Sequence, residues 1–220
     1  MKAVLISIRP KWCELIASGK KTIEVRKTRP KIETPFKCYI YCTHDNHKNA
    51  LHLYVNSGYG RKDIGVIGHW RSGKDVVDVN QHLPAYRYNA YLAEGKVIGE
   101  FVCDKVVRTC GWRLRGDTQQ CAKRTVAEAE LPKLACLAID EIVDYAGSEN
   151  REVVGWHISD LKIYDKPKEL GNFWKADKCS YATESGCTYK YHCFSAGQTQ
   201  RCGETLTRPP QSWCYVEELP

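Results

Sequence analysis

An eight-residue stretch near the start of the chain, Gly19 to Arg26, constrains the fold most, because it combines a helix end, a turn and a strand. Gly19 can end a helix in the left-handed conformation, which costs glycine no steric penalty. Ile23 and Val25 alternate with polar residues, and this period of two predicts a strand with one apolar face. The stretch therefore predicts a short helix before Gly19 and a strand directly after the turn.

Charged side chains occupy the other face of this strand. Because side chains alternate along a strand, Glu24 and Arg26 project together into solvent or a cleft if the apolar face meets the core, with Lys21 beside them at the turn. The two cations can bind phosphate, while the carboxylate can orient Arg26 or act as a base. A simpler interpretation stays open, since charges on the open face of a half-buried strand are usually only solvated.

The stretch resembles the G-x-K-x-x-E-x-R signature of ASCH (activating signal cointegrator homology) domains, with Gly19, Lys21, Glu24 and Arg26 in the four fixed positions. Further similar segments extend almost from one end of the chain to the other, at residues 7–12, 95–101, 155–161 and 210–216. The chain looks most like the longer ASCH proteins of bacteria and their phages. The resemblance implies an α+β, PUA-like fold, in which short helices cover the openings of a mixed β-barrel.

The length of 220 residues, 43% of them hydrophobic, suits one domain that carries insertions. We expect a single domain over residues 1–220, with a loop-rich insertion at about residues 44–94 and a cysteine-rich insertion at about residues 175–205. The net charge of +7 suits a polyanionic partner without demanding one. The apolar run at residues 3–8 is too short to span a membrane, and we expect a cytoplasmic protein with no signal peptide and no membrane partner.

Besides the strand that contains Ile23 and Val25, hydrophobic periodicity predicts five more strands and three short helices. The strands are expected at residues 2–8, 36–43, 97–107, 153–164 and 213–217. The helices are expected at residues 11–18, directly after Pro10, and in two pieces of residues 125–145 that Pro132 separates. Residues 44–94 show no sustained period and are interpreted as loops and short hairpins, and the basic residues 108–124 are predicted to form a loop.

The family resemblance also implies a ligand cleft between the first helix and the barrel, lined by Lys21, Glu24 and Arg26, for RNA or a nucleotide. Arg26 offers a planar fork for phosphate or a base edge, Lys21 a mobile charge, and Glu24 an acceptor for an amino group. Residues in the other similar segments are candidates to complete this ligand-binding site: Arg9, His157, Ser159, Ser212 and Trp213. For Trp213, as for Trp12 on the first helix, a place in the core is the simpler interpretation.

Two alternatives to a binding function remain open. One small ASCH branch hydrolyses N4-acetylcytidine with a threonine nucleophile where this chain has Glu24, and Thr22 cannot be assumed to replace it. In a hydrolase acting on RNA or a modified nucleoside, the catalytic candidates are Lys21 and Glu24, with Lys21 stabilising charge and Glu24 or His157 acting as base. In a non-catalytic protein-interaction module, the long insertion would plug the cleft.

Twelve cysteines separate into two groups. Eight are scattered among predicted strands and helices and are expected to be reduced thiols: Cys13, Cys38, Cys42, Cys103, Cys110, Cys121, Cys136 and Cys214. The other four, Cys179, Cys187, Cys193 and Cys202, can ligate a structural zinc ion, with His192 as a substitute ligand. No C-x-x-C pair is present, so free thiols or a redox pair are the alternative. The sequence points to no cofactor other than this zinc.

Overall fold

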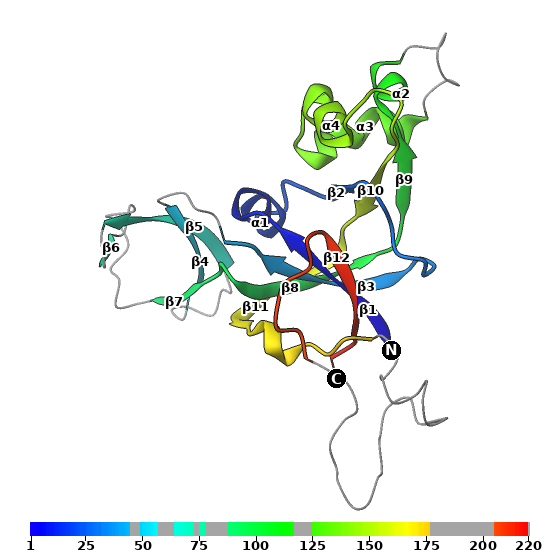
Figure 1. Cartoon of the computed structure of the whole chain (residues 1–220). Coiled ribbons are helices and arrows are strands. Elements are labelled where there is room, and N and C mark those ends of the chain that lie inside the picture. The colour runs from blue at the N-terminus through cyan, green and yellow to red at the C-terminus, as the bar shows by residue number, and fades with distance from the viewer. Residues whose placement is uncertain are drawn as a thin grey trace, which may run out of the picture.

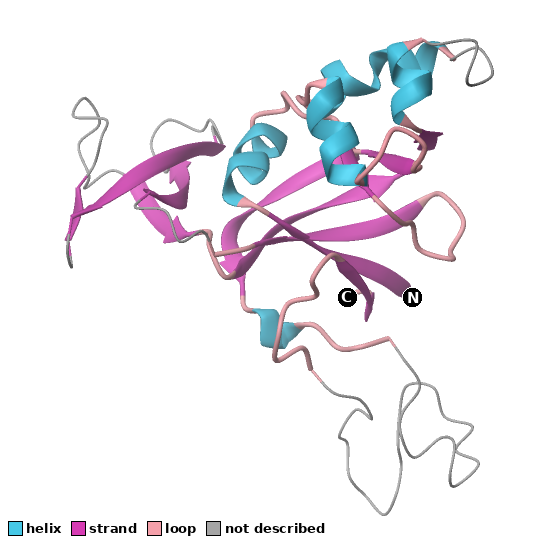
Figure 2. Cartoon of the chain, turned by 45° about the horizontal axis from the view of Figure 1, so that its top comes forward, coloured by secondary structure: helices cyan, strands magenta, loops and turns pink. Residues whose placement is uncertain are grey.

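The chain folds into three hydrogen-bonded sheets and four α-helices in the part that this computed structural model describes (Figure 1). The described residues are 1–44, 49–56, 64–72, 75–77, 88–116, 125–176 and 205–219. Figure 2 shows the helices α1 to α4 gathered over one side of the five-stranded and three-stranded sheets, with the four-stranded sheet set apart from them.

The largest sheet is mixed and has five strands in the order β11-β8-β3-β1-β12. Its strands are β1 (Lys2–Ile8), β3 (Phe36–Cys42), β8 (Lys96–Cys103), β11 (Ser159–Lys168) and β12 (Trp213–Glu217). β1 pairs in parallel with β3, and the other neighbours are antiparallel. β1 is buried on both faces, which explains why six of its residues are apolar or small. These strands confirm the predictions for residues 2–8, 36–43 and 213–217.

A second sheet has three strands in the order β2-β10-β9, namely β2 (Ile23–Arg26), β10 (Val153–His157) and β9 (Val106–Thr109). Three helices lie together beyond this sheet in Figure 1: α2 (Gly111–Arg115), α3 (Val126–Ala135) and α4 (Ile139–Ala146). The two predicted helices in residues 125–145 are therefore confirmed. The break between them was misplaced, because Pro132 lies inside α3, and the helix ends at Cys136, whose φ is +52°. The predicted loop at residues 108–124 was also wrong over its first half, which contains the end of β9 and all of α2.

The long insertion contains a four-stranded antiparallel sheet, which corrects the prediction of loops and short hairpins. Its order is β6-β5-β4-β7, and its strands are β4 (Asn49–Asn56), β5 (Ile64–Ser72), β6 (Asp75–Val77) and β7 (Tyr88–Leu92). Gly65 and Gly68 interrupt the apolar pattern of β5, so the sequence shows no clear period of two there.

Two segments, β8–β9 and β10–β11, each belong to both the five-stranded and the three-stranded sheet. They lie antiparallel to each other and form one bent ribbon that joins the two sheets. β8 leads into β9 through Asp104-Lys105, and β10 leads into β11 through Ile158. The pairing of β9 with β10 and of β8 with β11 places the two bends side by side. The single strands predicted at residues 97–107 and 153–164 are therefore two strands each, and β11 runs to Lys168 instead of ending at residue 164.

Three buried apolar clusters hold these layers together. The first joins one face of the five-stranded sheet to α1 (Pro10–Ala17) and β10, and includes Ile6 and Trp156. The second covers the opposite face of that sheet and includes Leu5. The third packs α3 and α4 onto the three-stranded sheet through residues such as Ile23 and Leu131. The cores therefore lie on both sides of β1 and beneath β2, the two strands that flank the candidate site.

The closed barrel implied by the resemblance is not shown by the hydrogen-bonded strand order. Within the described residues, β11 and β12 end the five-stranded sheet without pairing to each other, and β2, β9 and β10 form a separate sheet. The described residues thus show a mixed α+β fold with a few short helices. None of the described helices is long and apolar enough to cross a membrane.

Candidate functional site

The position of the charged strand β2 follows from the turn before it. Gly19 has a φ of +73°, as expected for a glycine that ends a helix, and the Lys21 backbone N–H donates to Leu15 O at 2.9 Å to close the turn. Ile23 and Val25 then enter the apolar cluster beneath α3 and α4. Because side chains alternate, Glu24 must point away from that cluster.

The predicted trio of charges does come together, but it is buried and not solvated. Glu24 Oε1 lies 2.9 Å from Arg26 Nη2, and Glu24 Oε2 lies 3.4 Å from Lys21 Nζ. The side chains are only 2% (Lys21), 7% (Glu24) and 10% (Arg26) exposed. This corrects the simpler interpretation of a solvated strand face, because α1 and the surrounding elements cover the polar side of β2 as well as its apolar side.

Two backbone carbonyls fix the cations of this trio. Lys21 Nζ donates to Ala135 O at 2.7 Å, at the end of α3, and Arg26 Nη2 donates to Ser7 O at 2.5 Å, in β1. Lys21 is therefore not the mobile charge that the sequence suggested. The Arg26–Ser7 hydrogen bond also connects the three-stranded sheet to the five-stranded sheet.

Burial changes the electrostatics of the site. Removal from water lowers the pKa of the Lys21 amine below its usual value, although the neighbouring Glu24 carboxylate acts in the opposite direction. Arg26 Nε is buried and has no hydrogen-bond partner among the described residues. A buried guanidinium N–H without a partner is unfavourable, and an acceptor supplied by a ligand would satisfy it.

A cleft of about 670 Å³ opens beside the trio. The sequence-predicted residues Arg9 and Ser212 line it together with Lys21, Glu24 and Arg26. The remaining walls are mainly apolar or aromatic: Ile8, Trp12, Val25, Leu137, Tyr145, Pro209 and Pro210. Trp12 is thus a cleft residue and not purely a core residue, with the Lys21 amine 5.1 Å from its ring centroid.

Sequence reasoning missed the contribution of α4 and of the segment before β12. Glu141 and Tyr145 are four residues apart on α4, so they share one helix face and both reach the cleft. Tyr145 lines the cleft and is 40% exposed, and no local sequence pattern marks it, because its place depends on where the fold puts α4. The cleft therefore lies between α1, β2 and α4, with residues 209–212 along its edge.

Two candidates from β10 and β11 lie elsewhere. His157 Nδ1 is 2.7 Å from Asp104 Oδ1, and the Ser159 hydroxyl donates to Val102 O at 2.8 Å. Neither His157 nor Ser159 lines the cleft. His157 pairs with Ile23 of β2, but its side chain contacts Asp104 at the bend between β8 and β9, and Ser159 belongs to β11, which pairs with β8.

Trp213 and Thr22 do not belong to the cleft either. The Trp213 ring packs 6.2 Å from that of Trp156 and 5.4 Å from that of Tyr215, which favours the structural interpretation of this residue. Thr22 is tied by its backbone, since its N–H donates to Leu134 O, and its hydroxyl is not among the groups lining the cleft.

The predicted zinc ligands lie outside the described residues: Cys179, Cys187, Cys193, Cys202 and His192. In the part of the chain that is described, no group of three or more His, Cys, Asp or Glu side chains could hold a metal ion. Seven of the eight scattered cysteines are described, and none of these seven forms a disulfide bond, which agrees with the predicted reduced thiols. Cys121 lies outside the described residues.

A short helix, a glycine turn and a strand bearing Lys-x-x-Glu-x-Arg beside a cleft, in a mixed α+β fold, define a PUA-like domain. The ASCH domain family model matches residues 6–130, more than half of the chain. The chain belongs to the ASCH domain family.

Similar solved structures come from Zymomonas mobilis. The structure of its ASCH protein is 15% identical, the alignment covers 98% of this chain and 88% of that one, and the TM-score is 0.46. A single-substitution variant of that protein is also 15% identical, the alignment covers 99% of this chain and 92% of the variant, and the TM-score is 0.49. A comparison with curated protein sequences finds no match.

Proposed function

We propose that the cleft binds RNA, a nucleotide or a modified nucleoside. The observation that carries this proposal is the buried Lys21–Glu24–Arg26 trio at the side of a cleft with aromatic walls. Burying three charges is expensive, and a protein gains little stability from such a group compared with apolar residues of similar volume. A recognition role for the trio accounts for that cost.

The size and the walls of the cleft suit a nucleotide. Its volume of about 670 Å³ falls in the usual range for sites that enclose small molecules. Trp12 and Tyr145 offer ring faces on which a base can stack, and such stacking does not depend on the identity of the base. The prolines at residues 209 and 210 add rigid apolar surface.

The polar groups provide recognition of a base and of a phosphate. Glu24 has two oxygens with about four lone-pair sites, and its contacts with Lys21 and Arg26 leave acceptor capacity for an exocyclic amino group. Arg26 Nε can donate to a ligand oxygen. Arg9 is exposed at the cleft and suits a phosphate there.

A hydrolase is the second candidate, and the lowered pKa of Lys21 favours it. A lysine amine with a lowered pKa releases its proton more readily than an ordinary lysine, and groups with perturbed pKa values gather at active sites. Glu24 replaces the threonine of the N4-acetylcytidine hydrolases, and Thr22 is not in the cleft, so hydrolysis here would need a water molecule or another nucleophile.

The test compares wild type with Lys21→Met, which removes the charge but keeps the apolar stem, and with Lys162→Met as an exposed control. Each protein is incubated with a mixed pool of RNA and modified nucleosides, and bound species and products are followed together by mass spectrometry. Ligand retained by wild type and control but lost from Lys21→Met, without products, supports the binding function. Products that disappear with Lys21→Met would establish the hydrolase instead. If neither a bound ligand nor a product is found, both the binding function and the hydrolase are contradicted, and a protein-interaction role is favoured.

A further inference from the structure

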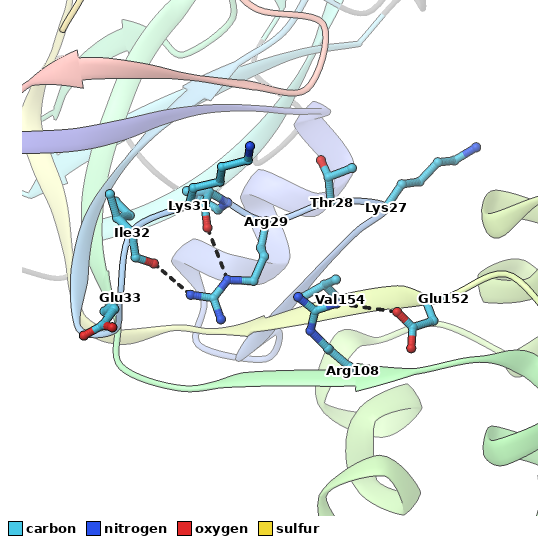
Figure 3. Close-up of a pocket in the computed structure, with 10 residues that line it drawn as sticks. Lys27, Thr28, Arg29, Lys31, Ile32, Glu33, Arg108, Glu152 and Val154 are labelled. Atoms are coloured by element: carbon cyan, nitrogen blue, oxygen red, sulfur yellow. Dashed lines mark hydrogen bonds and ion pairs between the residues drawn. The ribbon is translucent and has the colours of Figure 1, made fainter.

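A second concave site adjoins the segment that follows β2. We call it the 27–33 groove, because residues 27–33 form one side and Arg108, Glu152 and Val154 form the other. Its volume is about 440 Å³. Figure 3 shows Arg29 between the Ile32 end of this segment and the strand residues Arg108 and Glu152.

The groove carries a surplus of positive charge. Its cationic side chains are Lys27, Arg29, Lys31 and Arg108, and its carboxylates are Glu33 and Glu152. The pair between Arg108 Nη1 and Glu152 Oε2, at 3.5 Å, is the one ion pair that these six side chains make with described residues. The groove can therefore attract anions in a way that a surface of balanced charge cannot.

Arg29 is held by neutral groups. Its Nη2 donates to Ile32 O at 2.7 Å and its Nε to Pro30 O at 3.2 Å, as the dashed lines in Figure 3 show. Carbonyl oxygens orient a guanidinium group without neutralising its charge. Arg29 is thus a fixed cation, half-buried in the wall of the groove.

The last strand, β12, holds the same segment from another side. Trp213 Nε1 donates to Thr28 Oγ1 at 3.1 Å, and the Lys31 backbone N–H donates to the Tyr215 hydroxyl at 2.7 Å. The segment is therefore a built surface, on which the exposed Lys31 side chain projects from an anchored backbone (Figure 3).

No described residue lines both the groove and the cleft, and the groove residue next to the cleft along the chain is Lys27. This residue directly follows Arg26 of the trio, and its amine lies 5.2 Å from the ring centroid of Tyr145, which lines the cleft. Three residues of extended chain span at most about 11 Å, so Arg26 in the cleft and Arg29 in the groove are close neighbours. A ligand that occupies the cleft and continues past Lys27 enters the groove.

We propose that the 27–33 groove binds the phosphate backbone of a single RNA strand, one nucleotide of which occupies the cleft. This inference rests on the function proposed above and narrows its ligand from a free nucleoside to a strand. Aromatic rings in one site and a row of cations in the next are the combination by which proteins hold single strands. The exposed amines of Lys27 and Lys31 would contact phosphates as mobile charges, and Arg29 as a fixed one.

The test measures fluorescence anisotropy of a labelled, mixed-sequence single-stranded RNA of about twelve nucleotides over a series of salt concentrations. Wild type is compared with Lys27→Ala/Lys31→Ala and with the control Lys133→Ala/Lys162→Ala. The control removes the same charge from exposed lysines that line neither the groove nor the cleft. A mixture of nucleoside monophosphates serves as the short ligand.

Loss of two phosphate contacts should reduce the slope of log affinity against log salt by about 1.4, since each contact contributes about 0.7 for a single strand. At low salt we expect the affinity for the strand to fall about tenfold relative to that for the monophosphates, a difference of about 1.4 kcal/mol. The control should keep the wild-type slope.

An unchanged slope, or an equal change in the control, would overturn the groove inference while leaving the cleft function in place if wild type binds both ligands. Wild type that binds neither the strand nor the monophosphates would overturn both proposals. Binding of polyglutamate with the same dependence on Lys27 and Lys31, without binding of the strand, would identify an acidic protein as the partner and would also overturn the inference.

Discussion

At the scale of single residues, the cleft depends on Glu24, because this carboxylate is the counter-charge of two buried cations. Its oxygens lie 2.9 Å from Arg26 Nη2 and 3.4 Å from Lys21 Nζ. In the described part of the chain, no other carboxylate forms an ion pair with either cation. The pair formed by Arg108 and Glu152 offers a contrast, since these side chains are 58% and 65% exposed.

Glu24→Gln should lower the free energy of unfolding by about 3 kcal/mol, because it leaves two buried cations without a compensating charge. The matched control, Glu152→Gln, removes the carboxylate of the exposed pair and should change stability by less than about 0.5 kcal/mol. Urea unfolding followed by circular dichroism measures both. Equal effects of the two substitutions would show that the trio is solvated in solution.

The carboxylate of Glu128 should make the stability of the protein depend on pH in acid. Its carboxylate accepts hydrogen bonds from Arg113, including Nη2 at 2.8 Å, and from Thr125, and these lower its pKa from about 4.5 to about 2. A pKa that is lower in the folded state contributes stability above pH 4.5, which is lost as the pH falls towards 2. Glu128→Gln should therefore flatten the fall in unfolding free energy between pH 4.5 and 2. Glu130→Gln, on an exposed position of the same helix, should retain the wild-type fall.

At the scale of elements, the contact between α3 and the three-stranded sheet sets the position of the charged strand. Gly155 of β10 faces Leu131 of α3 and Ile23 of β2 so closely that an added Cβ would lie 2.8 Å and 2.9 Å from their methyl carbons. The glycine thus permits the helix to approach the strand that carries Glu24 and Arg26.

Gly155→Ala should destabilise the protein by about 2 kcal/mol, because the core must shift to accept the methyl group, and should also weaken ligand binding in the cleft. Gly171→Ala is the control, since no atom lies within 4 Å of its added Cβ, and it should change stability by less than about 0.5 kcal/mol. Thermal unfolding measures the stability of both variants, and fluorescence anisotropy measures their affinity for the labelled RNA. A stable Gly155→Ala with unchanged affinity would contradict the tight packing of α3 on β10.

The sequence alone predicted the helices and strands that are marked by a pattern of neighbouring residues. Gly19 marks the end of α1, and the alternation of Ile23 and Val25 predicts β2. The burial of Glu24 and Arg26 could not be predicted, because it depends on segments from distant parts of the chain, such as Ser7 of β1, which accepts a hydrogen bond from Arg26, and the end of α3, which holds Lys21. Tyr145 was missed for the same reason, since α4 reaches the cleft only through the tertiary fold.

Errors in the predicted strands have equally specific causes. Only Asp104 and Lys105 interrupt the apolar run between Cys103 and Val106, and Trp156 and Ile158 keep a period of two, so the pattern predicts one strand at each place although the chain changes sheets there. His157 and Ser159 were placed at the cleft because they lie in a segment similar to the family, and that similarity does not show where their side chains project. In the insertion, glycines within β5 concealed a regular strand.

At the scale of the whole molecule, the reactivity of each cysteine depends on how deeply the fold buries its thiol. Cys136 and Cys214 are partly exposed, whereas Cys13, Cys38 and Cys103 are buried, and burial raises the pKa of these three thiols, to about 12 for Cys103. Thiolate is the reactive form, so buried thiols react slowly.

Iodoacetamide applied to the native protein at neutral pH should therefore modify Cys136 and Cys214 before Cys13, Cys38 and Cys103. Peptide mapping by mass spectrometry measures the order, and urea should abolish the difference. Early modification of Cys13 or Cys38 would contradict the packing of α1 against the five-stranded sheet.

The bent ribbon and one side-chain hydrogen bond together set how the two sheets lie at the cleft. Ser7 comes from the five-stranded sheet and Arg26 from the three-stranded sheet, and their hydrogen bond joins the two sheets beside the cleft. The ribbon joins the same two sheets a second time, through the bends at Asp104-Lys105 and Ile158. The pair between Asp104 and His157 lies at these bends and outside the cleft. We expect substitutions there to change the relative position of the two sheets, and with it the size of ligand that the cleft admits, without removing any group that lines it.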